Sequence, residues 1–324
     1  MKVLVTGSSG HLGEGLMRTL GAEAVGLDIL PGEFTQFVGS IADRAHVRQC
    51  LADADAVLHT ATLHKPHAAT HGTQDFIDTN VTGTLVLLEE AVAAGVRTFV
   101  FTSTTSAFGA ALTPPPCAPA AWIDETVQPV PKNIYGVSKT AAEDLCELFH
   151  RRHGLNCIVL RTSRFFPEED DNDAIRAAFA DENAKANEFL FRRVDLEDAV
   201  SAHLAALERA PDIGFARYIV SATTPFTRAD MAAVRDDPAA VVARLCPDFA
   251  ETYAARGYTM FPTIDRVYDN TRARQDLGWR PTYDFGRVLQ QLADSTPIGS
   301  TLARTVGIKG YHAEEFAEGP YPVE

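Results

Sequence analysis

The sequence has few cysteines, and none of them are closely paired. They are widely spaced and include no Cys-x-x-Cys motif: Cys50, Cys117, Cys146, Cys157 and Cys246. An odd number of distant cysteines argues against a disulfide framework and against a zinc ribbon. We therefore expect reduced thiols and a cytoplasmic location.

Long apolar runs and clusters of basic residues are also missing. No run approaches the roughly 20 apolar residues that a membrane helix requires, and residues 1–6 lack the features of a signal peptide. The formal net charge is -14, whereas nucleic-acid surfaces need clustered lysine and arginine. The sequence therefore predicts a small-molecule substrate and neither a nucleic-acid nor a membrane partner.

The pattern that is present alternates apolar strand-like runs with helical periodicity. The predicted strands are 2–6, 24–28, 35–38, 56–60, 98–103, 157–161 and 217–220, and the predicted helices are 11–20, 73–95, 133–154 and 195–209. Continuous apolar strands of this length are typical of a parallel sheet that is buried on both faces. We expect an α/β protein with a doubly wound parallel Rossmann-type sheet and a smaller C-terminal substrate-binding region.

The pattern loosens after the 157–161 strand, and we place a domain division there. Residues 1–165 are expected to form the dinucleotide-binding domain, with 194–220 returning to it, while 166–193 and 221–324 mainly bind substrate. Within the first domain, residues 113–119 read TPPPCAP, whose missing amide donors predict an irregular excursion. The tail, 310–324, has no periodicity that indicates a role.

A glycine-rich sequence, TGSSGHLG, joins the first strand to the first helix. Gly7 turns the chain tightly, Gly10 lets backbone amides approach a pyrophosphate, and Gly13 lets the helix pack close to the sheet. The second strand ends at Asp28, where a carboxylate can accept hydrogen bonds from ribose hydroxyls and repel a 2'-phosphate. Since no arginine follows Asp28, NAD is favoured over NADP; a simple turn is the alternative role for this residue.

Tyr135 and Lys139 lie four residues apart near the start of a predicted helix, and hence on one face. A neighbouring ammonium and an oxidised nicotinamide both favour the phenolate, so we expect a tyrosine pKa lowered toward neutrality. Such a tyrosine can accept a proton from a substrate hydroxyl. The 98–103 strand leads into a row of hydroxyls, Thr102 to Ser106, at the sheet edge where ligands bind. Local bonding to the loop backbone is the alternative role for these hydroxyls.

These features belong to a series of motifs that follow one another along the chain. They are TGSSGHLG (6–13), HTAT (59–62), NVTGT (80–84), YGVSK (135–139), VDLEDAV (194–200) and LGWRP (277–281). In this order they resemble the extended short-chain dehydrogenase/reductase family, the NAD-dependent epimerase/dehydratase group, almost from end to end. The resemblance implies that Thr104 is the catalytic serine or threonine, Tyr135 the acid/base and Lys139 the anchor of the nicotinamide ribose.

The resemblance also implies a cofactor site, a partner and a structural residue. The residues that it places along NAD are Gly7, Ser9, Gly10, His11, Leu12, Gly13, Asp28, Ser40, Ile41, Thr60, Ala61, Thr62, Thr102, Tyr135, Lys139 and Arg164. It implies a homodimer in which helices 73–95 and 133–154 pair into a four-helix bundle. Asn80 corresponds to the helix asparagine of the family, with a structural role.

Some residues depart from the family pattern. Ser40 replaces a common aspartate beside the adenine, and Phe108 replaces a common tyrosine. Residues 162–172 read TSRFFPEEDDN in place of an Asn-x-Tyr-Gly-Pro pattern. The four acids in this segment would repel a nucleotide diphosphate unless they face solvent. Arg192 and Arg193 could compensate for them, or could be solvated charge beside a strand.

The sequence says least about which residues bind the substrate. The candidates that we name are His64, Thr105, Ser106, Phe165 and Arg192. A basic cluster after the fourth strand, containing His64, Lys65, His67 and His71, could bind a carboxylate or a phosphate. No acidic residue completes a zinc motif with the last two histidines, so we expect no metal.

These features predict an NAD-dependent oxidoreductase or epimerase that transfers hydride at a carbohydrate-like hydroxyl or ketone, with a nucleotide sugar as a candidate substrate. A dehydrogenase of a non-nucleotide sugar or of a hydroxy acid is the first alternative, and a non-catalytic NAD-sensing protein is the second. A dehydratase is less favoured, because Thr105 and Ser106 stand where that branch of the family has Asp-Glu.

Overall fold

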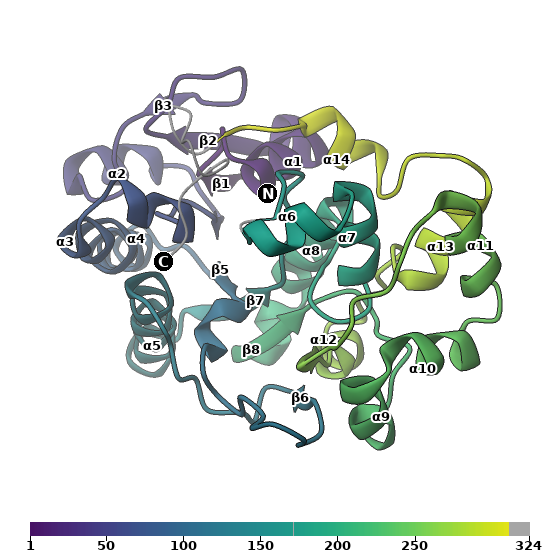
Figure 1. Cartoon of the computed structure of the whole chain (residues 1–324). Coiled ribbons are helices and arrows are strands. Elements are labelled where there is room, and N and C mark those ends of the chain that lie inside the picture. The colour runs from purple at the N-terminus through teal and green to yellow at the C-terminus, as the bar shows by residue number, and fades with distance from the viewer. Residues whose placement is uncertain (171, 311–324) are drawn as a thin grey trace.

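The protein, described by a computed structural model over residues 1–170 and 172–310, is built around one seven-stranded parallel sheet (Figure 1). Its strand order is β3-β2-β1-β4-β5-β7-β8. The strands are β1 (Val3–Thr6), β2 (Ala24–Asp28), β3 (Phe37–Val38), β4 (Ala56–His59), β5 (Thr98–Thr104), β7 (Asn156–Thr162) and β8 (Phe215–Val220). This arrangement confirms the doubly wound parallel sheet. Residues 311–324, most of the predicted tail, lie outside the described residues.

Helices cover both faces of the sheet and bury two apolar cores. One face packs against α1 (His11–Leu20), α8 (Leu196–Ile213) and α14 (Thr301–Val306), and the other against α2 (Arg44–Cys50), α4 (Gly83–Ala93) and α5 (Ile134–His153). Side chains alternate along each strand: Val3 and Val5 enter the first core, and Leu4 enters the second. This two-sided burial explains why the strands read as continuous apolar runs.

The helix ends follow local capping rules. The Asn133 side chain accepts a hydrogen bond from the Gly136 amide at 3.0 Å and starts α5, and Gly154, at φ +70°, ends it. Asp195 caps α8 by accepting from the Glu197 amide at 2.8 Å. The predicted helices 133–154 and 195–209 are therefore confirmed, with α8 running four residues further.

The segment predicted as one helix, 73–95, is not a continuous α-helix, so this prediction is wrong in that respect. It consists of α3 (Thr73–Phe76), a π-helical turn η3 (Ile77–Thr82) and α4. The apolar spacing is compatible with the extra residue per turn, so the sequence pattern did not reveal it. Single π turns are frequent at functional sites, and this one carries Asn80.

The predicted strand 35–38 is shorter than expected. The Thr35 amide donates to Gly32 O at 3.1 Å, and its hydroxyl is hydrogen-bonded to Ser8 Oγ at 2.8 Å. Because Thr35 takes part in this turn, only Phe37 and Val38, which form β3, pair in the sheet. A second, two-stranded parallel sheet, β6 (Ala121–Ile123) with β9 (Arg266–Tyr268), was not predicted, because its strands are too short to show a period.

The C-terminal region packs around a core of its own beside the β8 edge (Figure 1). Its helices are α6 (Asp173–Ala178), α7 (Asp181–Glu188), α9 (Met231–Asp236), α10 (Pro238–Leu245), α11 (Phe249–Arg256) and α13 (Phe285–Ala293). The remaining helix, α12 (Thr271–Asp276), packs against β8, and its Ala273 lies in the first sheet core. Short helical turns complete the described chain: η1 (Gly21–Glu23), η2 (Lys65–Ala69), η4 (Thr105–Phe108) and η5 (Arg228–Asp230). Within residues 1–170 and 172–310, no helix combines the length and apolarity needed to cross a membrane.

Candidate active site

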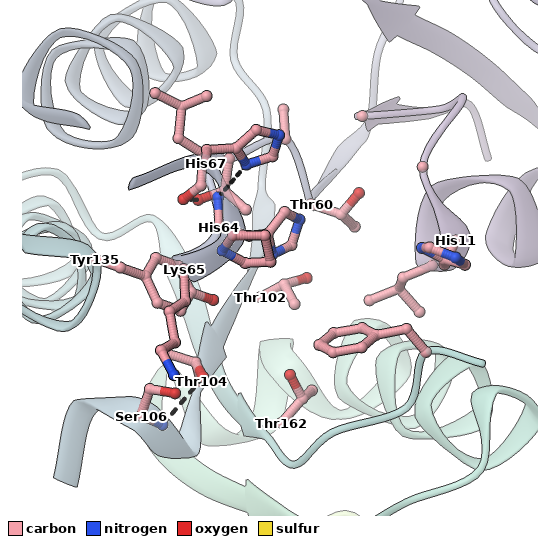
Figure 2. Close-up of a pocket in the computed structure, with 18 of the residues that line it drawn as sticks. His11, Thr60, His64, Lys65, His67, Thr102, Thr104, Ser106, Tyr135 and Thr162 are labelled. Atoms are coloured by element: carbon pink, nitrogen blue, oxygen red, sulfur yellow. Dashed lines mark hydrogen bonds between the residues drawn. The ribbon is translucent and has the colours of Figure 1, made fainter. Parts of the chain in front are cut away.

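A pocket of about 1140 Å³ runs along the carboxyl ends of the central strands (Figure 2). Its wall contains every residue that the sequence singled out as catalytic, cofactor-binding or substrate-binding, except Lys139. The lysine lies beneath the wall, with only 2% of its surface exposed. The sequence therefore located the pocket, since the carboxyl edge of a parallel sheet collects these loops.

The glycine loop has the geometry of a pyrophosphate cradle. Gly7 has φ +74°, and a Cβ there would lie 2.8 Å from the Ala61 amide nitrogen. A Cβ on Gly13 would lie 1.8 Å from Gly7 O, so the first turn of α1 can approach β1 only with glycine there. Gly10 is less restricted, with its nearest atom at 3.2 Å. The N-terminus of α1 therefore faces the pocket with backbone amides able to bind an anion.

The other end of the cradle fits an adenosine. Asp28 accepts hydrogen bonds from the Ser9 amide and the Leu30 amide, both at 2.9 Å, which holds its carboxylate against the glycine loop. Ser40 and Ile41 line the pocket beyond it. The lining residues of this described stretch, 27–41, include no lysine or arginine to bind a 2'-phosphate. The residues present therefore fit NAD.

Thr104 and Tyr135 meet at the centre of the pocket. Thr104 ends β5, Tyr135 starts α5, and their hydroxyl groups are hydrogen-bonded to each other. The Thr104 hydroxyl also accepts from the Ser106 amide at 3.1 Å, which fixes its position (Figure 2). Lys139 lies one turn after Tyr135, and its Nζ is 4.1 Å from the centre of the Phe101 ring.

Burial moves the pKa values of this tyrosine and lysine in opposite directions. Burial raises the pKa of Tyr135 to about 12, and the hydrogen bond with Thr104 only partly offsets this. Burial lowers the pKa of Lys139 to about 7, against the raising effects of Glu143 and Cys146. The protein's own residues therefore do not lower the pKa of Tyr135 toward neutrality, because desolvation raises it and only Thr104 acts in the other direction.

A buried carboxylate, Glu143, acts on the charge of Lys139 from the same helix. Glu143, one further turn along α5, accepts from Ser103 Oγ, from Arg161 Nη2 at 2.7 Å and from Arg217 Nε at 3.1 Å. It is 1% exposed. The sequence analysis missed this residue, although its spacing of four from Lys139 places it on the same helix face.

Asn80 joins two walls of the site. Its side-chain oxygen accepts from the Leu63 amide at 2.8 Å and from the Thr62 hydroxyl at 2.9 Å, and its amide donates to Ser138 Oγ at 2.9 Å. These bonds tie the loop after β4 to the helix that carries Tyr135. Asn80 does not line the pocket, in keeping with a structural role.

Several residues predicted to bind the cofactor line the pocket, but their hydroxyl groups are hydrogen-bonded to other groups of the protein. The Thr102 hydroxyl is bonded to His203 Nε2 at 2.7 Å, and the Thr60 hydroxyl donates to Thr6 O at 2.7 Å. Phe108, which departs from the family pattern, is buried, and the Arg161 guanidinium carbon lies 4.9 Å from the centre of its ring. Phe108 therefore belongs to the support of the site and not to its surface.

The histidines after β4 form the side of the pocket next to Tyr135. The His64 and Tyr135 ring centres are 6.0 Å apart, and the His64 amide donates to His67 Nδ1 at 2.8 Å (Figure 2). Burial, with the nearby charges of His67 and Lys139, lowers the pKa of His64 well below its usual value. A neutral imidazole here can bond a substrate hydroxyl. In the part of the chain that the structure describes, no three potential metal ligands gather.

Two acids of the segment after β7, Glu168 and Asp170, are buried and do not meet the expectation that the acids face solvent, whereas Glu169 is exposed. Asp170 is 6% exposed and pairs with Arg164 at 2.7 Å and with Arg192 at 3.1 Å. Both arginines also contact Glu188, whose pKa falls to about 2 because three arginines outweigh its burial. Glu168 is likewise buried, with Oε1 2.9 Å from His11 Nε2. Arg192 therefore compensates for the negative charge of Asp170 in this segment. Asp171 lies outside the described residues.

The C-terminal region supplies lining residues that the sequence analysis missed. Asp265, Arg266 and Tyr268 reach the pocket from β9 and the residue before it. Lys309 also lines it and pairs with Glu14 of α1. The sequence held no signal for these residues, because their place depends on pairing between segments more than 140 residues apart.

The sequence model of the NAD dependent epimerase/dehydratase family matches residues 3–216. A UDP-glucose 4-epimerase of Rhizobium meliloti (strain 1021) is 27% identical over 324 aligned residues, covering 89% of this chain and 94% of the relative. An uncharacterised protein of Sinorhizobium fredii is 34% identical over 166 residues, 49% of this chain and 39% of the relative. An NAD-dependent glucose-6-phosphate dehydrogenase of Haloferax volcanii is 29% identical over 177 residues, 49% of this chain and 66% of the relative. The match thus spans less than two thirds of the last two relatives.

Solved structures share the fold. A short-chain dehydrogenase/reductase superfamily protein of Agrobacterium tumefaciens with bound NAD superimposes with a TM-score of 0.64 and 24% identity, covering 91% of this chain and 97% of that one. A UDP-glucose 4-epimerase of Thermotoga maritima with UDP-glucose gives a TM-score of 0.62 and 21% identity, covering 91% and 99%. At these identities the likeness establishes the architecture.

Proposed function

Because the chain belongs to the NAD dependent epimerase/dehydratase family, we propose that it is an epimerase or dehydrogenase acting at a hydroxyl or ketone of a carbohydrate. The family is NAD-dependent, and the glycine loop with Asp28 fits that dinucleotide. The observation that carries the proposal is the hydroxyl pair of Thr104 and Tyr135 above buried Lys139. A nucleotide sugar is the first candidate substrate, given the UDP-glucose 4-epimerase that aligns with 89% of the chain.

In this proposal Thr104 orients the reacting oxygen and Tyr135 moves the proton. NAD, when bound, supplies the hydride chemistry. With a pKa of about 12, Tyr135 holds its proton at neutral pH and is suited to donate it to a carbonyl oxygen. For the reverse transfer the phenolate needs a nearby positive charge, which Lys139 provides when it is protonated. Glu143 favours that protonated form.

A dehydrogenase of a non-nucleotide sugar is the second candidate. The matched NAD-dependent glucose-6-phosphate dehydrogenase of Haloferax volcanii favours it. The remaining alternative, an NAD-sensing protein without turnover, is disfavoured by the intact Thr104, Tyr135 and Lys139.

Retention of the cofactor separates an epimerase from a dehydrogenase. Purified protein is dialysed extensively and denatured, and the released NAD is measured per chain. Retention near one per chain favours an epimerase and calls for isomerisation assays with nucleotide sugars. Loss of NAD favours a dehydrogenase and calls for NADH formation assays with sugars and hydroxy acids.

In either assay, Tyr135→Phe is expected to lower kcat by roughly 100-fold or more, because it removes the group that transfers the proton. NAD should still bind, since the glycine loop is untouched. Turnover at the parent rate by the variant would contradict the assignment of Tyr135 as the acid/base.

The proposal also covers the oligomeric state, the cellular location and the roles of the two parts of the chain. Apolar side chains on η3, α4 and α5 stay partly exposed, including Val81, Ala141 and Leu148, which supports a homodimer through a four-helix bundle. The free cysteines support a cytoplasmic location. Residues 1–165 with 194–220 would bind the dinucleotide, and 166–193 with the part after 220 would mainly bind substrate.

A further inference from the structure

After α14 the chain returns to the glycine loop from the opposite end of the sequence. Gly307, at φ +65°, ends α14, and residues 307–310, which we call the C-terminal strap, lie against α1 (Figure 1). Lys309 and Gly310 of the strap line the pocket together with the first residues of α1. The strap therefore reaches the end of the pocket that holds the pyrophosphate cradle.

Two buried carboxylates hold the strap in place. Glu168 Oε1 accepts from the Lys309 amide at 3.2 Å and from the Gly310 amide at 3.4 Å, and the Lys309 ammonium pairs with Glu14 of α1. Ile308 contributes little packing, since it is 71% exposed. Segments that make few buried apolar contacts open at a low cost in free energy. The attachment of the strap thus depends on charge and hydrogen bonding.

Both carboxylates lie close to the place that the glycine loop offers to phosphates. Glu14 is in the first turn of α1, and Glu168 Oε1 lies 2.9 Å from Nε2 of His11, the first residue of that helix. Glu14 and Glu168 are 8% and 5% exposed, so water screens their charges poorly. An uncompensated carboxylate there would repel the pyrophosphate that the helix N-terminus attracts.

Lys309 supplies a compensating charge. Glu14 pairs with Arg18 at 2.8 Å as well as with Lys309, and although burial acts to raise the pKa of Glu14, these two cations hold it below its usual value. Removal of Lys309 would leave Arg18 against two buried carboxylates, with His11 adding a positive charge only when it is protonated. A docked lysine therefore favours a bound pyrophosphate, and a bound pyrophosphate favours a docked lysine by the same factor.

We propose that docking of the C-terminal strap and binding of NAD stabilise each other through this charge balance. The inference rests on the NAD-binding part of the proposed function and is independent of the sugar. It gives a role to two residues that the reaction does not use, His11 of the glycine loop and Glu168 of the segment that departs from the family pattern. Without NAD the strap opens more often, so its state reports whether the cofactor site is filled.

Hydrogen exchange of the strap is the first test. The full chain is compared by mass spectrometry after removal of NAD and in saturating NAD, in peptides that cover residues 307–310. We expect NAD to slow exchange of the strap by roughly 5- to 50-fold, within the usual range of coupling between two sites. Lys309→Met should lose most of this protection, because methionine keeps the length of the side chain without its charge. Lys2→Met removes an exposed pair with Asp53 outside the pocket wall, and this matched control should keep the parent pattern.

Release of NAD tests the coupling in the other direction. Protein loaded with isotopically labelled NAD is chased with excess unlabelled NAD, and the loss of label gives the dissociation rate. Lys309→Met should release NAD roughly 5- to 50-fold faster, since differences in affinity appear mainly in dissociation. Adding Glu14→Gln should bring the rate back toward that of the parent, because it removes the carboxylate that has lost its partner.

Strap exchange that is the same with and without NAD, or release from Lys309→Met at the parent rate, would overturn the inference. Failure of Glu14→Gln to slow release from Lys309→Met would also overturn it, since charge balance would not be the link. If the strap responds to NAD while the protein turns over no sugar, the proposed reaction fails and this inference stands. A strap indifferent to NAD, in a protein whose turnover Tyr135→Phe abolishes, would remove only this inference.

Discussion

At the scale of single residues, burial decides the acid–base properties of this site. Tyr135 and Lys139 are 8% and 2% exposed, and each pKa moves toward the neutral form of its group. The sequence showed that the two side chains share a helix face, but it could not show how little water reaches them. That depends on Phe101 and on other side chains contributed by distant strands.

The state of Lys139 is expected to depend on Glu143. Replacing Glu143 with Gln removes a negative charge that raises the lysine pKa, so this pKa should fall below its value of about 7. Since the ammonium exists only below the pKa, the alkaline limb of kcat/KM should move to lower pH, by about one unit for a buried pair. A pH–rate profile of the variant measures the shift.

Asp144→Asn is the matched control for this change. Asp144 is the neighbouring residue on α5 and also pairs with Arg217, but its side chain is 80% exposed. An alkaline limb that is the same in Glu143→Gln and in the parent would show that Glu143 does not act on Lys139. A fall in stability alone would not reproduce the expected result, because it moves no pKa.

At the scale of elements, the π turn η3 connects the sheet edge to the catalytic helix. The turn places Asn80 where it can bond both the loop after β4 and Ser138 of α5. A regular helix has 3.6 residues per turn, so without the π turn the asparagine would face a different direction. The apolar spacing of 73–95 predicted a helix here but not its irregularity, because both forms bury the same side chains.

Replacing Asn80 with Ala is expected to loosen this connection. The Leu63 amide and Ser138 hydroxyl would lose partners, at a cost of about 2–3 kcal/mol in the free energy of unfolding. Hydrogen exchange should increase in residues 62–65 and in the first turn of α5, and kcat should fall as Tyr135 loses its fixed position. Denaturant unfolding and exchange mass spectrometry measure the two effects.

The exposed Asp78 lies on the same π turn, and there Asp78→Ala removes only a surface bond from Gln74. This control should keep the parent stability and exchange pattern. If Asn80→Ala exchanged no faster than Asp78→Ala around Leu63, then Asn80 would not be what joins these two elements.

At the scale of the whole molecule, the outward face of α5 is where a second copy would pack. Val137 is 45% exposed, whereas the next two residues of the helix, Ser138 and Lys139, are buried. A charged side chain in the centre of an apolar interface must be desolvated without a partner. We expect Val137→Arg to convert a dimer into a monomer, measured by sedimentation equilibrium.

Val38→Arg is the control for this prediction. Val38 is 53% exposed on the edge strand β3, away from α5, so its replacement should leave the dimer intact. A parent protein that sediments as a monomer at micromolar concentration would contradict the homodimer itself. A dimer that survives Val137→Arg would place the interface elsewhere.

The sequence by itself determined the Rossmann-type half of this protein, because the signals there are local. Strand-length apolar runs, the spacing of Gly7, Gly10 and Gly13, and the four-residue step from Tyr135 to Lys139 each act within one element or one turn. Only the tertiary structure decided the charges and the far end of the pocket. The pairing of Asp170 and Glu188 with Arg164 and Arg192 joins residues 4 to 24 positions apart, and the placement of Arg266 beside Gly109 joins residues 157 positions apart. Contacts of that range depend on packing and desolvation, which leave no periodic pattern in the chain.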